Sequence, residues 1–416
     1  MTAVPVSDVA AHRRAILVLL CGFSALAIAF GIRATFGLFL NPISADLGWS
    51  IGTLSFAFAL QNLLWGVAQP FAGALADSKG ATKVVAGGLL LYAAGLVMMA
   101  WSDSLLLFDA STGLIIGMAQ SAVGFPVILG AIGRATPPER RSLYLGIATA
   151  GGSFGQFIFA PIGQQLISSL GWIDALIAMA AIAVAATLLA VGLRGEREAK
   201  AEFVDRLRTS ADDGMRIREA LAVAARHRGF LLLNAGFFVC GFQLAFITVH
   251  LPAFATLCGL AAAAGSTGIA LIGVANIFGT VAAGQIGSIY RPKFPLSLIY
   301  FGRSLGAVAM VTIPVTEAVL YGFSIVMGLL WLSTVPLTSS VVSQIFGPKH
   351  VGMLFGIVFL SHQLGSFAGV WLAGYLFDVF GSYDLVWWLS AALGLFAALV
   401  HLPIDDRRIA LRVASA

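Results

Sequence analysis

The chain has 416 residues, of which 59% are apolar and only 10% are charged. A soluble domain carries about 25% charged residues and its single core stops growing at about 250–300 residues, so the composition excludes a soluble globular protein. It indicates a polytopic membrane protein instead. The net charge of +5 does not indicate a nucleic-acid partner, because the basic residues gather at the ends of apolar segments. The odd set of cysteines (Cys21, Cys240 and Cys258) argues against a disulfide framework or a zinc site, and we expect no metal and no cofactor.

Twelve stretches are long enough to cross a bilayer, which needs about 20 mainly apolar residues. Backbone groups in hydrocarbon must pair within their own segment, so these stretches are predicted to be helices and the fold class to be all-α. The first stretch is not a cleavable signal peptide, because it is too long, contains Arg33 and lacks a small-residue cleavage site. The predicted spans are 15–40, 51–76, 84–101, 105–133, 142–168, 173–193, 229–257, 262–290, 296–314, 317–345, 351–380 and 384–403.

The basic residues fall on one side of these spans. Of the 24 Lys and Arg residues, all but Arg33 and Arg303 lie in the two tails or in alternate loops. The opposite loops carry no Lys or Arg, and hold acidic residues instead: Asp46, Asp103, Asp174, Glu317 and Asp384. The positive-inside rule therefore predicts a multi-pass protein of an inner cell membrane, with both termini in the cytoplasm.

The polar segment 194–228 divides the spans six and six. We expect an amino-terminal six-helix bundle (1–193), a cytoplasmic loop (194–228) and a carboxy-terminal six-helix bundle (229–416). Within the loop, Ile217, Leu221 and Ala224 are spaced as one apolar helix stripe. A short helix on the membrane surface and a solvated linker both fit this pattern.

The two halves match as repeats at an offset of 210 residues. The matched pairs are Pro126 and Pro336, Gly146 and Gly356, Gly155 and Gly365, Gly171 and Gly381, and Asp174 and Asp384. Parallel six-helix repeats are typical of transporters that move two bundles around a site near the middle of the membrane.

The stretch Gly73–Lys83 reads GALADSKGATK and lies between the second and third spans. It is similar to the loop signature of the major facilitator superfamily, with Ser78 in place of the usual arginine, and the chain resembles this superfamily over essentially its whole length. The resemblance implies that Asp77 holds a cytoplasmic gate shut at the start of the eleventh helix. We expect Lys83, Arg140 and Arg141 to belong to the same gate. The simpler alternative is that Asp77 only ends its helix.

Three further stretches are similar to the monocarboxylate transporter and oxalate:formate antiporter group: Phe36–Trp49, Gly152–Gly155 with Pro161, and Leu360–Gly365. Animal members carry a lysine in the first helix where this chain has Arg33, and oxalate antiporters carry a lysine in the eleventh helix where this chain has His362. The arginine that the group carries in the eighth helix is missing, since Asn276–Thr280 reads NIFGT.

Two arginines lie inside predicted spans, where a charge costs at least about 2.5–3.5 kcal/mol and usually faces a cavity or a partner. Arg33 is predicted to lie roughly 27 Å from the cytoplasmic end of its helix, at 1.5 Å per residue. A guanidinium there suits a carboxylate, which it can bind with two parallel hydrogen bonds. A structural ion pair and snorkelling to the outer headgroups are the alternatives. Arg303 lies nearer the cytoplasmic start of the ninth span, where it could bind substrate or stabilise the second bundle.

Several other polar side chains inside spans are candidates for the site. His362, near the middle of the eleventh span, and His250, in the outer part of the seventh, could carry a coupled proton or be hydrogen-bonded core imidazoles. Gln120, Gln243, Asn276 and Gln363 could orient a substrate or bond helices together. Trp331 and Phe125 could wall a cavity or belong to the core. No carboxylate lies near the middle of a span, whereas exporters of cationic drugs usually need a buried negative charge.

Together these features predict a secondary active transporter of a small, monocarboxylate-like organic anion, which works by alternating access with proton coupling or exchange. Its partners would be the carboxylate, protons or a counter-anion, and the lipid bilayer; we expect a monomer. A multidrug or neutral-metabolite carrier of the same fold is the alternative if both arginines are structural. The short tails disfavour a membrane sensor. An enzyme is disfavoured because no nucleophile–base pair, metal-ligand cluster or phosphate loop is visible.

Overall fold

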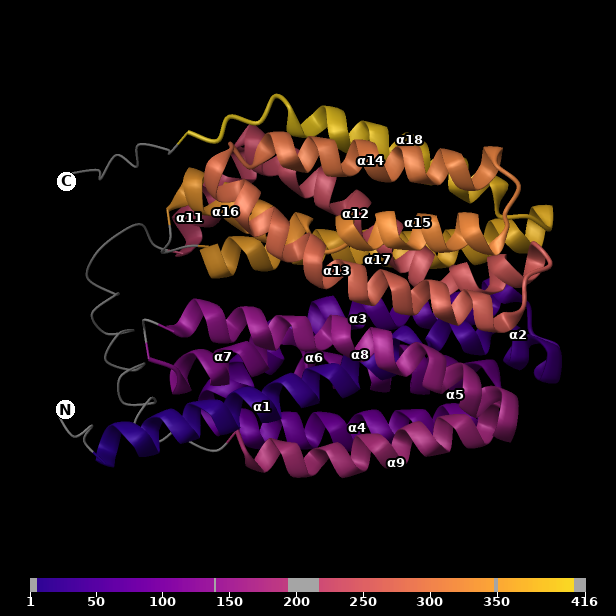
Figure 1. Cartoon of the computed structure of the whole chain (residues 1–416), viewed down its shortest axis with the longest axis horizontal. Helices are drawn as coiled ribbons and strands as arrows, with labels where there is room; N and C mark the ends of the chain where they lie inside the picture. Colours follow the sequence, from indigo (N-terminus) through magenta and orange to yellow (C-terminus); the bar gives the residue numbers. More distant parts are fainter. Residues whose placement is uncertain (1–5, 138–139, 194–216, 348–350, 408–416) are drawn as a thin grey trace. The chain divides into compact units, whose positions relative to one another are not determined.

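The computed structural model describes residues 6–137, 140–193, 217–347 and 351–407. In this described part the chain is helical and contains no strand, which confirms the all-α prediction. Twelve of its segments are long and apolar enough to cross a membrane. The elements in chain order (Figure 1) are α1 (Val6–Ala34), α2 (Phe36–Leu47), α3 (Ile51–Lys79), α4 (Ala81–Ala100), α5 (Leu105–Phe108), the π-helix η1 (Asp109–Ile115), α6 (Ile116–Ala122), α7 (Phe125–Ala135), α8 (Arg141–Leu170), α9 (Trp172–Val191), α11 (Ile217–Arg226), α12 (Arg228–Leu257), α13 (Ala262–Ile289), α14 (Lys293–Thr312), α15 (Glu317–Leu330), α16 (Thr334–Phe346), α17 (Val351–Phe380) and α18 (Asp384–His401).

Eleven of the twelve predicted spans agree with the observed ones to within three residues at each end. The first span is the exception, because helix continues to Leu47, seven residues beyond the predicted end at 40. The chain turns at Thr35, whose hydroxyl donates to the carbonyl of Ile32 at 2.7 Å, and then restarts as α2 with Pro42 inside it. Gly48, with a φ of 67°, ends α2 in the left-handed conformation that glycine adopts at no steric cost.

Two further spans predicted as single helices are also broken. The fourth span breaks between α6 and α7, and the tenth breaks between α15 and α16. The matched prolines Pro126 and Pro336 lie just after the two breaks. Proline has no N–H and its ring clashes with the carbonyl four residues earlier, so each break releases backbone groups that need other partners.

Contacts divide the chain into two compact units. Unit 1 contains residues 1–35 and 64–207, and unit 2 contains residues 36–63 and 208–416. The division follows chain order except that α2 and the first part of α3 group with unit 2. The predicted bundles 1–193 and 229–416 and the loop 194–228 remain predictions. Within that loop, 194–216 lies outside the described residues and Ile217–Arg226 is the helix α11, whose place on the membrane surface remains a prediction.

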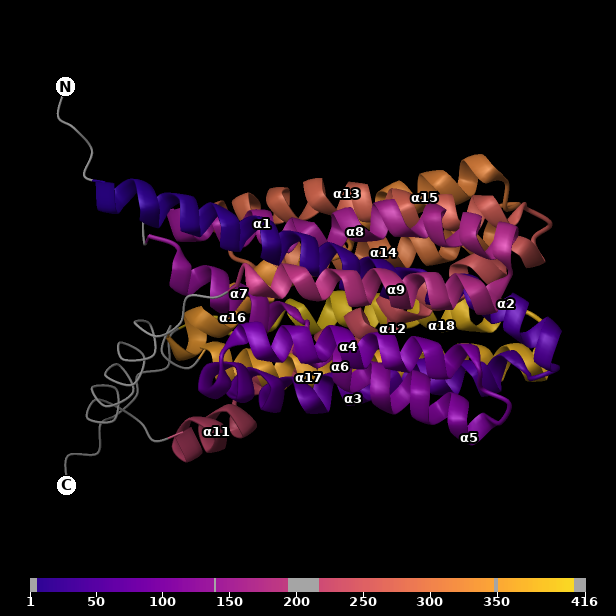
Figure 2. The same cartoon turned by 90° about the horizontal axis from the view of Figure 1, so that it is seen from below.

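The same helix pairs form in both units. In unit 1, α1 packs along α8 and α4 packs along α9; in unit 2, α12 packs along α17 and α14 along α18. Figures 1 and 2 both show α8 running beside α1. An offset of 210 residues places α1 on α12, α8 on α17, α4 on α14 and α9 on α18. This correspondence supports the predicted repeat.

Glycines set the closest of these contacts. A methyl group at Gly155 of α8 would overlap the carbonyl oxygen of Ala27 in α1, and one at Gly365 of α17 would overlap the carbonyl oxygen of Phe238 in α12. The partner helices carry Gly31 and Gly241 at the same crossings, again 210 residues apart. Small residues let the two backbones touch, which is how helices pack tightly in a membrane.

We predict that Gly155→Ala will destabilise the protein by about 1–3 kcal/mol, because backbone atoms of Ala27 cannot move aside as a side chain can. Gly146→Ala is the matched control on the same helix, since nothing lies within 4 Å of a methyl group there. Alanine at that position should leave stability unchanged or raise it by about 0.5–1 kcal/mol. Unfolding in detergent measures both, and equal losses in the two variants would contradict the proposed contact.

Candidate functional site

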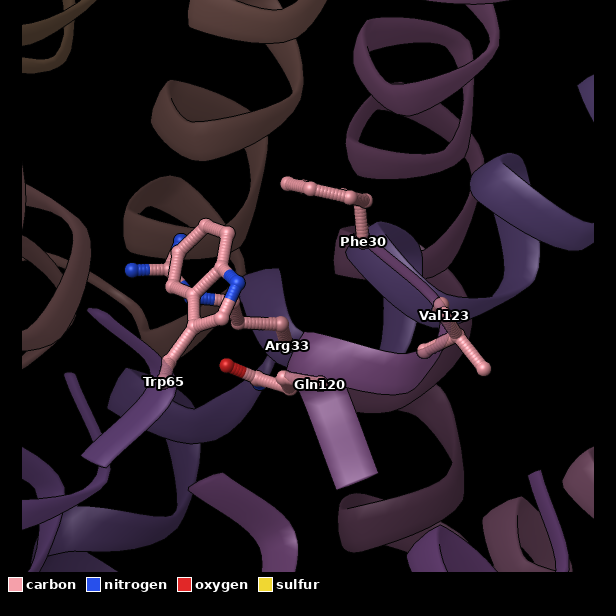
Figure 3. Close-up of a pocket in the computed structure, with 6 residues that line it drawn as sticks. Phe30, Arg33, Trp65, Gln120 and Val123 are labelled. Atoms are coloured by element: carbon pink, nitrogen blue, oxygen red, sulfur yellow. The ribbon is translucent and has the colours of Figure 1, made fainter. Parts of the chain in front are cut away.

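A small pocket in unit 1 brings together two of the predicted site residues, Arg33 and Gln120 (Figure 3). Arg33 lies in the last turn of α1 and Gln120 lies in α6, just before the break. Figure 3 shows the indole of Trp65, from α3, beside the guanidinium of Arg33. The remaining lining residues are Ala29, Phe30 and Val123. A cation, an amide and apolar walls therefore meet in one place.

The guanidinium of Arg33 rests against an aromatic ring that is itself anchored. Its Cζ lies 5.0 Å from the centroid of the Trp65 ring, a cation–π distance. The indole Nε1–H donates to Oε1 of Gln69 at 2.9 Å, and Nε2 of Gln69 donates to the carbonyl of Ser121 at 3.1 Å. Ser121 lies in the last turn of α6, so this chain of contacts runs from Arg33 to the broken helix.

Gln120 is anchored from the other side of the pocket. Its Nε2 donates to the hydroxyl of Tyr92 at 3.4 Å, and that hydroxyl donates to the carbonyl of Ala29 at 3.4 Å. Both bonds are long, but Gln120 and Tyr92 are buried, where water does not compete for them. These two hydrogen bonds join α6, α4 and α1 at Ala29, one helical turn before Arg33.

The pocket is small. Its volume is about 10 Å³, which leaves room for about one water molecule. Phe30 narrows it, since its ring lies 5.7 Å from Trp65 and 4.4 Å from Phe125. Phe125, predicted as a cavity wall, thus packs against Phe30 and is not among the lining residues. A larger solute reaches Arg33 only after side chains of this pocket move.

A second cluster of polar residues, in unit 2, forms hydrogen bonds with the backbone at the break between α15 and α16. Arg303 is 1% exposed and donates to the carbonyl of Leu330 at 2.6 Å, to the carbonyl of Trp331, and to Sγ of Cys240 at 3.3 Å. Oδ1 of Asn276 accepts the N–H of Leu332 at 2.9 Å. Of the two interpretations of Arg303, this geometry favours the structural one, and Trp331 belongs to the buried break itself.

The two histidines differ in their hydrogen bonds. His250 is fully buried; its Nε2 lies 3.0 Å from the carbonyl of Val370 and its Nδ1 lies 3.1 Å from the hydroxyl of Tyr383. A carbonyl can only accept, so Nε2 donates and Nδ1 accepts, and the neutral ring is satisfied. His362 is half-buried, with Nδ1 3.4 Å from the hydroxyl of Ser366, and its ring interacts with the thiol of Cys240.

The two remaining glutamines are buried in unit 2. Nε2 of Gln243 donates to the carbonyl of Ser390 at 3.0 Å, so this side chain joins α12 to α18. Both amide atoms of Gln363, on α17, lack a hydrogen bond among the described residues. Gln363 therefore keeps both donor and acceptor capacity, whereas Gln243 has used its donor and keeps only an unbonded Oε1.

The predicted gate residues are only partly brought together. Oδ1 of Asp77, in the last turn of α3, pairs with Nη1 of Arg134 in α7 at 3.1 Å. Both side chains are partly exposed, and such pairs contribute about 0–1 kcal/mol. Lys83 and Arg140 are exposed and Arg141 is half-buried. Arg134 was not among the predicted gate residues.

Sequence reasoning missed Trp65, Gln69 and Tyr92. Trp65 and Gln69 lie four residues apart in one span, so they share a helix face, and this spacing was a usable signal. Tyr92 offered none, because its partners Ala29 and Gln120 lie 63 and 28 residues away in the chain.

We predict that Arg303→Gln will lower stability by about 1.5–3 kcal/mol, the usual loss for a hydrogen bond to a charged group, because the carbonyls of Leu330 and Trp331 lose their donor. Arg228→Gln, an exposed arginine at the start of α12, is the control and should leave the unfolding temperature unchanged. Thermal unfolding in detergent checks both. An unchanged unfolding temperature for Arg303→Gln would mean that the break is stabilised in another way.

Comparisons with known proteins agree with this architecture. The chain is 25% identical over 396 residues to "Monocarboxylate transporter 13" of Rattus norvegicus, which covers 93% of this chain and 88% of that protein. It is 25% identical over 392 residues to "Uncharacterized MFS-type transporter YcxA" of Bacillus subtilis (strain 168), covering 90% and 92%.

Solved structures show the same fold. A D-xylose-proton symporter aligns with a TM-score of 0.72 at 15% identity, covering 95% of this chain and 99% of that one. A bacterial homolog of the human lysosomal transporter Spinster, inward-facing and occupied, aligns with a TM-score of 0.72 at 14% identity, covering 92% and 95%. The family model of the Major Facilitator Superfamily matches residues 21–339. The chain therefore belongs to the Major Facilitator Superfamily of transporters.

Proposed function

We propose that the protein is a secondary active transporter of small organic monocarboxylates, which works by alternating access. The observation that carries this proposal is the Arg33 guanidinium in a pocket with Gln120. Planar guanidinium binds a carboxylate through two parallel hydrogen bonds. The similarity to proteins named monocarboxylate transporters, over 93% of this chain in two of them, supports a carboxylate as the substrate class.

We propose His362 as the residue that carries a coupled proton. Both ring nitrogens of His250 are bonded in the neutral form, whereas the bond from His362 to Ser366 is long, at 3.4 Å. A proton on His362 would attract a substrate anion, and because coupling between two sites is reciprocal, the anion would favour the proton. Arg33 cannot have this role, since a guanidinium stays charged. Exchange of two anions is the other coupling mode.

A carrier of neutral metabolites or of several drugs is the second candidate function. It is favoured by the pocket lining, which is aromatic or aliphatic except for Arg33 and Gln120. In that case the cation–π contact of Arg33 with Trp65 would be structural.

We propose that both termini and residues 194–228 face the cytoplasm of an inner membrane, where the protein acts as a monomer. The Lys and Arg residues of the tails and alternate loops support this orientation. Asp77, with Arg134 and the neighbouring Lys83, Arg140 and Arg141, would then lie on the cytoplasmic side as a gate. Asn276 and Gln363 remain proposed substrate contacts, and Gln243, Trp331 and Arg303 weaker ones.

We predict that Arg33→Gln will weaken carboxylate binding by about 10- to 150-fold, the range for losing a hydrogen bond to a charged group. Arg33→Lys should retain part of the affinity, because it keeps the charge and loses the two-pronged geometry. The measurement is equilibrium binding of short-chain and aromatic monocarboxylates, with their neutral amides and a cationic dye as comparison ligands.

Arg228→Gln is the control for this experiment, because it removes an exposed arginine that lies outside the pocket. Its carboxylate affinity should match that of the unmodified protein. Normal carboxylate binding by Arg33→Gln, or preferential binding of the amides or the dye, would favour the second candidate function.

We predict that His362→Gln will keep measurable carboxylate binding but flatten its dependence on pH, because glutamine cannot carry the proton that would assist the anion. His250→Gln is the comparison variant and should keep the pH profile. An unchanged profile in His362→Gln would leave anion exchange as the coupling mode.

A further inference from the structure

Gln120 presents a buried acceptor to the pocket. The side chain is 4% exposed, and its Oε1 has no hydrogen-bond partner among the described residues. Figure 3 shows this amide oxygen directed toward the side of the pocket that holds Arg33 and Trp65. The pocket therefore contains an unsatisfied acceptor close to a cation.

The orientation of the amide follows from its other hydrogen bonds. The single proton of the Tyr92 hydroxyl goes to the carbonyl of Ala29, so the hydroxyl oxygen can accept a hydrogen bond from Gln120. Nε2 of Gln120 supplies that hydrogen bond, which leaves Oε1 on the pocket side. A flipped amide would place two donors against each other at Tyr92 or break its bond to Ala29.

Apart from Arg33, whose N–H groups the proposed function assigns to the carboxylate, the other lining residues do not supply the missing donor. The one N–H of the Trp65 ring is already bonded to Gln69 at 2.9 Å. Ala29, Phe30 and Val123 have no polar side-chain atoms. A donor for Oε1 can come from a molecule that enters the pocket.

We propose that Oε1 of Gln120 accepts a hydrogen bond from a hydroxyl group of the substrate and thereby selects hydroxycarboxylates. The inference rests on the proposed function, in which Arg33 binds the carboxylate. Arg33 and Gln120 line one small pocket, whose side chains move before a solute enters, so we place the hydroxyl on the carbon next to the carboxylate. A 2-hydroxy acid meets both requirements.

The same geometry disfavours two close analogues. A 2-oxo acid turns a carbonyl oxygen toward the amide oxygen, so two acceptors face each other. An unsubstituted acid turns a methylene group there and leaves Oε1 buried without a donor. A water molecule is the competing partner, since the pocket has room for about one, and a water that stayed in place would satisfy Oε1 whichever acid was bound.

The test compares three acids with the same three-carbon skeleton, lactate, pyruvate and propionate, which are all ionised at neutral pH. Purified full-length protein should bind lactate about 5- to 150-fold more tightly than the other two, the range expected when a buried acceptor is left without a donor. In Gln120→Leu the three affinities should converge. Gln165→Leu, an exposed glutamine on α8, is the matched control and should keep the preference.

A second variant guards against a folding defect in Gln120→Leu. Gln120→Asn keeps the amide but withdraws its oxygen by one methylene group, and it should also lose the preference, with gel filtration and thermal unfolding verifying the fold. If none of the three acids nor the wider carboxylate panel binds, the proposed function fails. If the three acids bind equally to the unmodified protein, or if the lactate preference survives in both Gln120 variants, only the present inference is overturned.

Discussion

Hydrocarbon offers no water to a backbone group, yet the fourth and tenth membrane-spanning segments of this protein break next to a proline. Each break releases carbonyl and N–H groups that must be bonded by side chains. In unit 1, Gln69 bonds the carbonyl of Ser121; in unit 2, Arg303 and Asn276 bond the backbone of residues 330–332. Different residue types thus satisfy the same requirement in the two repeats.

This requirement connects the helix break to the candidate binding site. Gln69 bonds the broken helix with one end of its amide and the indole of Trp65 with the other. The ring of Trp65 in turn makes a cation–π contact with the guanidinium of Arg33. A rearrangement at the break would therefore move the surface on which Arg33 rests, which is a direct route from helix geometry to the position of the charge.

The two units use their intramembrane arginines differently. Arg303 donates hydrogen bonds to backbone carbonyls of its own unit, whereas Arg33 lines a pocket. The residue that matches Arg33 in the repeat is Gln243, which joins α12 to α18. Glycine contacts keep α1 close to α8 at Gly31, two residues before Arg33, so the charge is held on a tightly packed helix. The two repeats therefore have the same helix packing, but different polar side chains at matching positions.

The sequence alone determined the twelve membrane-spanning segments and their helical structure, because an apolar run of about 20 residues is a local property that the bilayer requires. The sequence also showed that the titratable side chains of Arg33, Arg303, His250 and His362 lie inside predicted spans. It could not identify the hydrogen-bond partners of Arg303 and His250, because Leu330 and Tyr383 are distant from them in the chain. Pro126 and Pro336 were visible, but the breaks were not, since a proline interrupts a buried helix only where neighbouring side chains can bond the released backbone. Tertiary structure decided these points, because a hydrogen bond depends on which groups meet in space.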